Sequence, residues 1–227
     1  GYELYAADWL GCGYSEWPQP GYGYNFKEET FMKTFENYLT AIGLGERKFT
    51  LVCQGYAWNQ FAAKWALKNP ERVSEIVFFN GPLMPDTKLP FVLQQYKIPM
   101  VKSFVAQDAM RSERFLEGGG PYVMSLQDAE RYRESFLDSM MPGLAVVDTM
   151  DRCDFSKLQK EIYTLSKESK IPVHVVWGVG DKYHPISEAV RFCEETGAKL
   201  IKIEGAGFVV QNDWPEKCVD ALKTFLL

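Results

Sequence analysis

The chain has 227 residues, which is enough for one sizeable domain with its own hydrophobic core. Its hydrophobic fraction of 46% and its charged fraction of 24% are those of an ordinary soluble globular protein. The net charge of −5 and the lack of a dense Lys/Arg run argue against binding to nucleic acid or to anionic membranes by bulk electrostatics. No run of about 18 apolar residues predicts a transmembrane segment.

The cysteines are odd in number, widely spaced and nowhere arranged as zinc ligands; they are Cys12, Cys53, Cys153, Cys193 and Cys218. This pattern predicts free thiols in a reducing compartment, and we predict neither a metal nor another cofactor. The first residue is Gly1, within a predicted strand. Either a targeting segment and part of the fold precede it, or the sequence covers part of a longer protein.

In chain order, the first half of the sequence alternates strands with helices. The apolar run 2–8 predicts a strand that enters a loop rich in glycine and proline, 11–23. Apolar residues at helical spacing predict a helix over 30–42, ended by glycines. The next elements are a strand over 49–53, a helix over 56–67 and a strand over 73–80.

The second half ends with the same alternation. Apolar runs predict strands over 172–178 and 199–204, with helices over 187–195 and 215–226. Strands that alternate with helices indicate a parallel sheet covered on both faces. The predicted fold class is therefore α/β, with a doubly wound and mostly parallel sheet.

Residues 84–169 interrupt this alternation. They contain helical patterns over 125–137 and 155–165 and a glycine patch over 117–121, but no clear strand. We interpret the stretch as a helical cap inserted into a core formed by 1–83 and 170–227, because the strands resume afterwards without a linker. The glycine patch lacks the lysine of a phosphate-binding loop, so we interpret it as a flexible hinge of the cap.

Three segments, taken in order, resemble capped α/β-hydrolases. The first is Asp8-Trp9-Leu10-Gly11-Cys12-Gly13-Tyr14-Ser15, followed by Trp17-Pro18, which is similar to the loop D-x-x-G-x-G-x-S-x-x-P. The second is Leu51-Val52-Cys53-Gln54-Gly55-Tyr56-Ala57, at the place of the nucleophile elbow G-x-S-x-G. The third pairs Trp177-Gly178-Val179-Gly180-Asp181 with Glu204-Gly205-Ala206-Gly207-Phe208, where the family places its acid and its histidine.

The resemblance covers nearly the whole chain and implies an α/β-hydrolase fold, without the family's first strands and without the loop that supplies half of the oxyanion hole. The nucleophile position falls on Gly55, the acid position on Asp181 and the histidine position on Phe208. A Ser-His-Asp mechanism needs a nucleophile and a base, and both are missing. We therefore predict a degenerate triad with no catalytic residue, and a chain that is not an enzyme.

Two further segments are similar to plastid-type α/β-hydrolase-like proteins of plants and algae. They are Trp65-Ala66-Leu67-Lys68-Asn69-Pro70 and Glu117-Gly118-Gly119-Gly120-Pro121-Tyr122, together with Gln54-Gly55 in the elbow. This narrower resemblance implies a photosynthetic source and a location in the plastid.

Other residues have competing interpretations. Cys53 could be a displaced nucleophile, but a small structural residue at the end of a strand fits it better. His184 could reach the old active-site mouth as a substitute base, or it could be a loop residue with a local hydrogen bond. Asp181 could cap a turn instead of meeting a ligand. His174 alternates with apolar residues and is expected to be a packed histidine.

The aromatic residues near these motifs could line an apolar ligand pocket or fill it. The predicted ligand-binding residues are Tyr14, Trp17, Tyr56, Trp58, Tyr183 and His184. Phe208 would occupy volume that a catalytic site leaves open.

Three functions follow from these patterns. The leading expectation is an inactive protein that serves as a structural or accessory subunit of a larger assembly, with other protein subunits as partners and an association with thylakoids. The first alternative is a protein that binds an apolar small molecule in the cap pocket. The second is a residual hydrolase or lyase with a non-standard mechanism, assisted by His184 or Cys53.

Overall fold

The computed structural model describes residues 1–18, 24–137 and 139–226. Its centre is a four-stranded parallel sheet in the order β1-β2-β3-β4. The strands are β1 (Phe49–Cys53), β2 (Val73–Phe78), β3 (Val173–Gly178) and β4 (Lys199–Ile203). This arrangement confirms the predicted α/β class with a parallel sheet.

The strands send alternate side chains to opposite faces of the sheet, as the period of two requires. Ile76 and Phe78 point into the larger core, and Val77 between them points into a smaller one. Helix α11 (Pro215–Leu226) covers the smaller core with Cys218 and Ala221. The helices near the larger core are α1 (Glu28–Ala41), α2 (Trp58–Lys68), α8 (Phe155–Lys167) and α9 (Ile186–Thr196).

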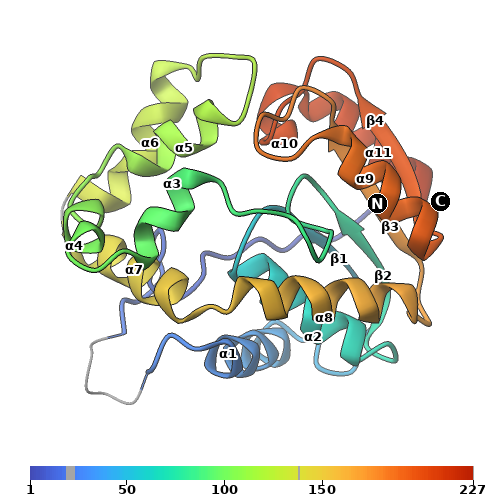
Figure 1. Ribbon diagram of the computed structural model, residues 1–227. Coiled ribbons are helices and arrows are strands. Elements are labelled where there is room, and N and C mark those ends of the chain that lie inside the picture. Colours follow the sequence, from blue (N-terminus) through green and yellow to red (C-terminus); the bar gives the residue numbers. More distant parts are fainter. Residues whose placement is uncertain (19–23, 138, 227) are drawn as a thin grey trace.

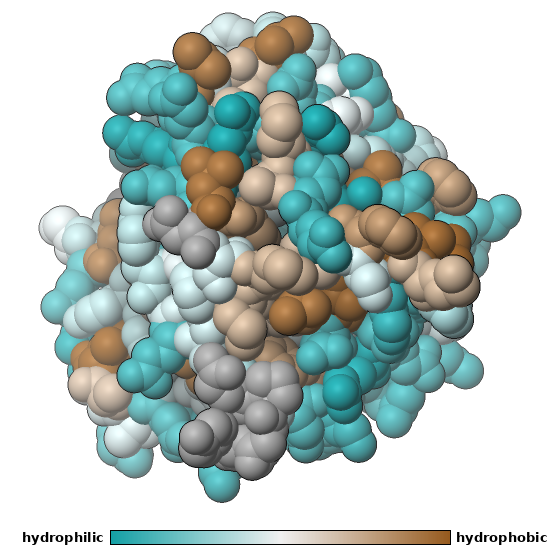
Figure 2. Space-filling model, turned by 90° about the vertical axis from the view of Figure 1, so that its left-hand side faces the viewer, coloured by the Kyte–Doolittle hydropathy of each residue, from teal (hydrophilic) through white to brown (hydrophobic). Residues whose placement is uncertain are grey.

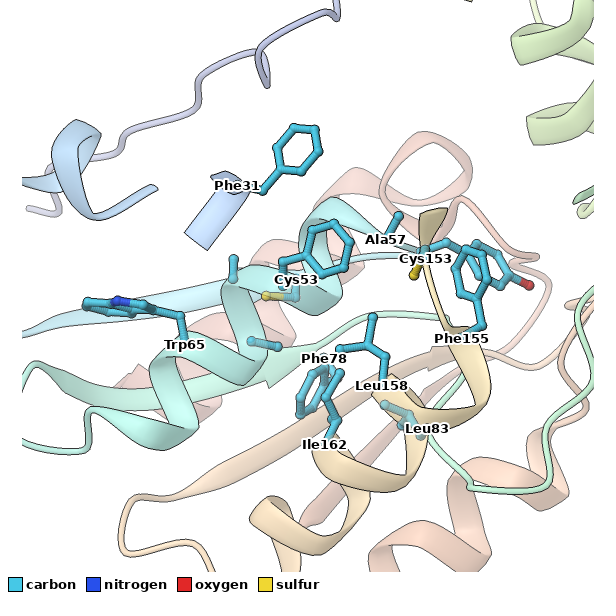
Figure 3. Packing of buried hydrophobic residues seen from close by; sticks show 14 of the residues in the cluster. Phe31, Cys53, Ala57, Trp65, Phe78, Leu83, Cys153, Phe155, Leu158 and Ile162 are labelled. Atoms are coloured by element: carbon cyan, nitrogen blue, oxygen red, sulfur yellow. The ribbon is translucent and has the colours of Figure 1, made fainter. Parts of the chain in front are cut away.

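The larger core is built where α2 and α8 cross the sheet. Figure 3 shows Phe78 of β2 close to Leu158 and Ile162 of α8, with Leu83 beside them. All four side chains are buried. Burying each of them contributes about 1.5–3 kcal/mol, so this layer holds the floor of the site in place.

Between β2 and α8 the chain forms short helices. These are α3 (Phe91–Gln94), the 3-10 helix η1 (Gln95–Lys97), α4 (Val101–Val105), α5 (Arg111–Gly118), α6 (Leu126–Leu137) and α7 (Met141–Arg152). Figure 1 shows them gathered on the side of the molecule away from the sheet. Among the described residues of 84–169 no strand occurs, while α8 itself packs against α2 and α9. The division into a core and a cap over 84–169 stays a prediction.

The strand predicted over residues 2–8 is wrong. These residues are extended but pair with no strand of the described chain, and Tyr2, Leu4 and Tyr5 are exposed. The segment is held by side-chain contacts, such as the hydroxyl of Tyr2 donating to the carbonyl of Leu226. An apolar run forms a stable strand only when a neighbouring strand accepts its backbone hydrogen bonds.

The following loop, 11–23, has the predicted turns as far as it is described. Gly11 and Gly13 take φ values of +88° and +52°, a region that suits glycine. The carboxylate of Asp8 accepts the backbone N–H of Tyr14 at 3.0 Å, and the Ser15 hydroxyl donates to the Asp8 carbonyl. Residues 19–23 at the end of this loop lie outside the described residues.

The glycine patch over 117–121 is packed, which differs from the flexible hinge that we expected. The carbonyl of Gly119 accepts the backbone N–H groups of Lys182 and Phe208. A Cβ on Gly119 would stand 2.5 Å from the Cβ of Phe208. These glycines therefore let the end of α5 lie directly against the loops that follow β3 and β4.

Candidate functional site

The predicted elbow forms a sharp bend between β1 and α2. Gly55 follows the strand with φ +83°, and its N–H donates to the carbonyl of Asn80 at 2.9 Å. Ala57 also has a positive φ, +48°, immediately before α2 begins. A non-glycine residue held there costs about 1–3 kcal/mol, so the surrounding structure must impose this turn.

Gly55 and Phe208 meet at the centre of the site. Phe208 lies in the loop after β4, and its ring atom Cζ is 3.5 Å from the place of a Cβ on Gly55. The ring is buried and packs against Tyr56 and Phe115. The two positions assigned to nucleophile and base are thus neighbours in space, but they offer only backbone and a benzene ring.

Asp181 lies in the loop after β3, and its carboxylate holds that loop. One oxygen accepts the backbone N–H groups of Tyr183 and His184 at 2.7 and 3.1 Å. The other accepts the side-chain amide of Asn80 at 2.8 Å. Burial raises the pKa of Asp181, and the hydrogen bond from Asn80 works in the opposite direction.

Sequence reasoning missed Asn80, whose amide also bonds the backbone of Gly178 in both directions. A signal was present: Asn80 stands just after β2, at the edge where the carboxyl ends of parallel strands meet and where α/β proteins place functional side chains.

His184 is fully buried and shares a hydrogen bond with the hydroxyl of Tyr56 through its Nε2 atom. Its Nδ1 atom is 3.7 Å from a carboxylate oxygen of Glu188, which in turn accepts the hydroxyl of Thr87. Burial raises the pKa of Tyr56 well above its usual range, so the phenol stays protonated at neutral pH. This contact joins residues 128 positions apart in the sequence and could not be read from it.

Two other candidate residues, Cys53 and His174, are packed as structural residues are. Cys53 is buried, and burial raises the pKa of its thiol well above the usual value, which opposes nucleophilic chemistry. His174 is packed as expected: its ring stacks on Phe225 with 4.1 Å between ring centroids, and Nε2 lies 3.0 Å from a carboxylate oxygen of Glu75.

A cavity of about 480 Å³ opens beside Gly55 and Phe208. Of the predicted ligand residues, Tyr14, Tyr56 and Trp58 line it. The other three, Trp17, Tyr183 and His184, are not among its lining residues. Tyr183 instead stacks on Phe115, with 4.9 Å between ring centroids, and its hydroxyl donates to the Phe115 carbonyl.

The helices α3 to α7 supply the opposite wall of this cavity, which sequence reasoning did not identify. Its apolar members are Leu93, Tyr96, Phe115, Leu116, Phe136, Val146 and Met150. Charged lining residues of both signs lie on the same cavity: Asp8, Arg131 and Glu134. The hydroxyl of Tyr14 donates to the carboxylate of Glu134 at 3.0 Å. A cavity of this size and lining suits a small, uncharged and largely apolar molecule.

Within the described ranges, no group of three or more histidine, cysteine, aspartate or glutamate side chains is placed to hold a metal ion. Of the helices that the structure describes, none has the length and apolar character required to cross a membrane.

Comparison with known proteins supports the fold. No protein-family model matches the chain, and a search of curated proteins gives no match. Among solved structures, the haloalkane dehalogenase DbeA from Bradyrhizobium elkani is similar with a TM-score of 0.78 and 17% identity, over 96% of this chain and 78% of that chain. A variant of the haloalkane dehalogenase DatA from Agrobacterium tumefaciens is similar with a TM-score of 0.77 and 18% identity, over 96% and 78%.

An α/β-hydrolase-fold protein from Burkholderia ambifaria gives a TM-score of 0.73 at 18% identity, over 95% of this chain and 77% of that chain. The chain therefore has the α/β-hydrolase fold. The comparisons do not show a particular closeness to plastid-type proteins.

Our leading functional expectation, an inactive accessory subunit of a larger assembly, is corrected by these comparisons. The similar structures include several haloalkane dehalogenases, which by their names are enzymes. The accessory-subunit interpretation is therefore not retained.

Proposed function

We propose that this protein binds an uncharged, largely apolar small molecule in the cavity between the elbow and the helices α3 to α7. The observation that carries the proposal is the cavity of about 480 Å³, with Gly55, Tyr56 and Phe208 on one wall and aromatic and aliphatic side chains on the other. The charged lining residues, Asp8, Glu134 and Arg131, include more acidic than basic groups, so they give no net attraction for an anion. The solved structures of similar fold bear the names of enzymes for haloalkanes, which are themselves small apolar molecules.

A matched ligand series tests this proposal. Isothermal titration calorimetry would compare 1-chlorohexane, 1-hexanol and hexanoate at pH 7, which have similar length and differ in polarity and charge. We expect saturable binding at one site for the two neutral ligands and binding at least tenfold weaker for hexanoate, because its carboxylate would lose its hydration in an apolar cavity. Tighter binding of hexanoate than of both neutral ligands would contradict the proposal.

We further propose that the bound molecule is not attacked by a triad, because the residues at positions 55 and 208 carry neither a nucleophilic atom nor a base. A second candidate function is slow turnover that uses Tyr56 and His184, favoured by their buried hydrogen bond and by the carboxylate of Glu188 behind it. Such an arrangement could donate or accept a proton at the wall of the cavity.

Product release separates these two candidates. The protein would be incubated with p-nitrophenyl butyrate and with 1-chlorohexane, and nitrophenolate and chloride would be measured. We expect no release above the uncatalysed rate. Release that is lost in both Tyr56→Phe and His184→Gln, while Tyr163→Phe keeps it, would establish the second candidate instead.

We also propose a plastid location, supported only by the resemblance of residues 65–70 and 117–122 to plastid-type proteins. Fluorescence microscopy of the full-length protein fused to a fluorescent protein in its own cells would test it. A signal outside plastids would contradict the proposal.

A further inference from the structure

The stretch from α3 to the start of α5 exposes an unusual amount of apolar surface. Phe91, Met100 and Phe104 are 68%, 80% and 74% exposed. Other exposed apolar residues of the same stretch are Ile98, Val101 and Met110. We call these six residues the α3–α5 face. Single exposed apolar residues are ordinary, but a group drawn from 20 consecutive residues marks an interaction surface.

The exposed residues are not the result of loose packing, because the inner side of the same segment is buried. Leu93, Tyr96 and Val105 are all buried in the core that this segment joins. The segment is thus apolar on both sides, with one side facing the protein and the other facing solvent. Figure 2 looks onto the side of the molecule that carries α4 and α7, where tan and brown residues interrupt the hydrophilic surface.

The same stretch of sequence carries a positive charge in an acidic protein. Residues 88–114 contain five basic residues and two acidic ones, a local charge of +3 in a chain of net charge −5. The basic residues are Lys88, Lys97, Lys102, Arg111 and Arg114. Of these, Arg111 is partly buried and donates to the Val92 carbonyl and to the side chain of Gln95. Surface contacts pair Lys102 with Asp151 and Arg114 with Asp108. Partly exposed pairs of this kind contribute at most about 1 kcal/mol and can rearrange when a stronger anion approaches.

We propose that the α3–α5 face docks the protein onto an anionic lipid bilayer. Exposed phenylalanine and methionine side chains would enter the boundary between headgroups and acyl chains, and the exposed basic residues Lys88, Lys97 and Arg114 would meet the negative headgroups. The net charge of the whole chain opposes this docking only weakly, because interactions between exposed charges are largely screened beyond about 8 Å at physiological salt. Docking at the interface requires no helix that spans the membrane.

This face adjoins the cavity. Leu93 and Tyr96, on the inner side of the same segment, line the cavity wall. An apolar molecule dissolved in the bilayer would therefore meet the protein beside its cavity. The docking itself does not depend on an occupied cavity, so it stands or falls independently of the proposed function.

Vesicle flotation with the whole protein tests the docking. Vesicles of phosphatidylcholine alone would be compared with vesicles that also contain roughly 30% phosphatidylglycerol, a content similar to that of an anionic leaflet. We expect the protein to float with the anionic vesicles. Raising the salt from about 50 mM to about 500 mM should lower the vesicle partition coefficient at least tenfold, because the Debye length shrinks. Absence of flotation with anionic vesicles at low salt would overturn the proposal.

Two matched double variants locate the surface. Met100→Ser with Phe104→Ser should lower the vesicle partition coefficient about tenfold or more, because two apolar side chains no longer enter the bilayer. Leu4→Ser with Val123→Ser removes two equally exposed apolar residues outside the face and should change it less than twofold.

Thermal unfolding and sedimentation velocity complete the test. Both double variants should unfold at the temperature of the unchanged protein, since the altered side chains are exposed. If the unchanged protein forms dimers that Met100→Ser with Phe104→Ser dissociates, or if the two double variants lose vesicle binding equally, the face is not a lipid-docking surface.

Discussion

Position 55 lacks a side chain, and the ring of Phe208 lies against this position. A Cβ there would already stand 3.5 Å from the ring, which is ordinary contact, so a longer side chain would collide with it. The ring in turn closes the end of the cavity and packs against Tyr56, Phe115 and Tyr183. At this scale the absent side chain at position 55 and the ring at position 208 are complementary in volume.

Phe208→Ala should reduce the free energy of unfolding by about 3–5 kcal/mol, because it leaves a space among three aromatic rings. Phe91→Ala is the matched control, since this ring is exposed, and it should change stability by less than about 0.5 kcal/mol. Urea denaturation followed by tryptophan fluorescence would measure both. Equal effects of the two substitutions would contradict the packing described for Phe208.

At the scale of elements, the backbone after α5 is hydrogen-bonded directly to the backbone of the loops after β3 and β4. Gly119 stands between Phe208 and Tyr183, and its carbonyl accepts hydrogen bonds from both loops. The helices α3 to α7 are thereby attached to the sheet next to the cavity. This attachment explains why a glycine patch that reads as flexible in the sequence is packed in the structure.

Gly119→Ala should destabilise the protein by about 2 kcal/mol or more, since the new methyl group would meet Phe208 and Tyr183 at less than 3.0 Å. Gly197→Ala is a useful comparison because Gly197 has φ +78° and open space around it. It should cost only the backbone strain of about 1 kcal/mol. Differential scanning calorimetry would show the larger loss for Gly119→Ala, and the reverse order would contradict the proposed contact.

Across the whole molecule, the sequence predicted the elements that bury their own apolar runs. The four strands of the sheet and the helix 215–226 were predicted correctly, because the spacing of apolar residues and the glycines and prolines that end an element are local signals. The segment 2–8 was misjudged, because an apolar run does not say whether a pairing strand is present. The meeting of Gly55 with Phe208 followed from motif order, but the Tyr56–His184 contact and the far wall of the cavity did not, since they join segments distant in the chain.

Burial of the thiols predicts a loss of stability in alkali. Burial raises the pKa of Cys153 to about 12 and that of Cys53 further, from a usual value of 9.0. The folded chain keeps these protons when the unfolded chain releases them. Stability is therefore fully present below pH 9 and falls as the pH rises above it, by about 1 kcal/mol per pH unit for each fully buried thiol.

Urea denaturation at about pH 9.0 and about pH 10.5 would measure this loss in the unchanged protein and in Cys53→Ala. The higher pH lies roughly 1.5 units above the usual thiol pKa. The variant should lose about 1–2 kcal/mol less over this interval, whatever its stability at pH 7. An equal loss in the two proteins would show that the Cys53 thiol is not held protonated by the fold.

The most direct test of the account is to fill the cavity. Val146 of α7 lines it, and Val146→Trp would place an indole inside, whereas Val219→Trp adds the same group to an exposed position on α11. Calorimetric titration with 1-chlorohexane should show binding by the unchanged protein and by Val219→Trp, and binding at least about tenfold weaker by Val146→Trp. Unaltered binding by a folded Val146→Trp protein would contradict the claim that this cavity is the ligand site.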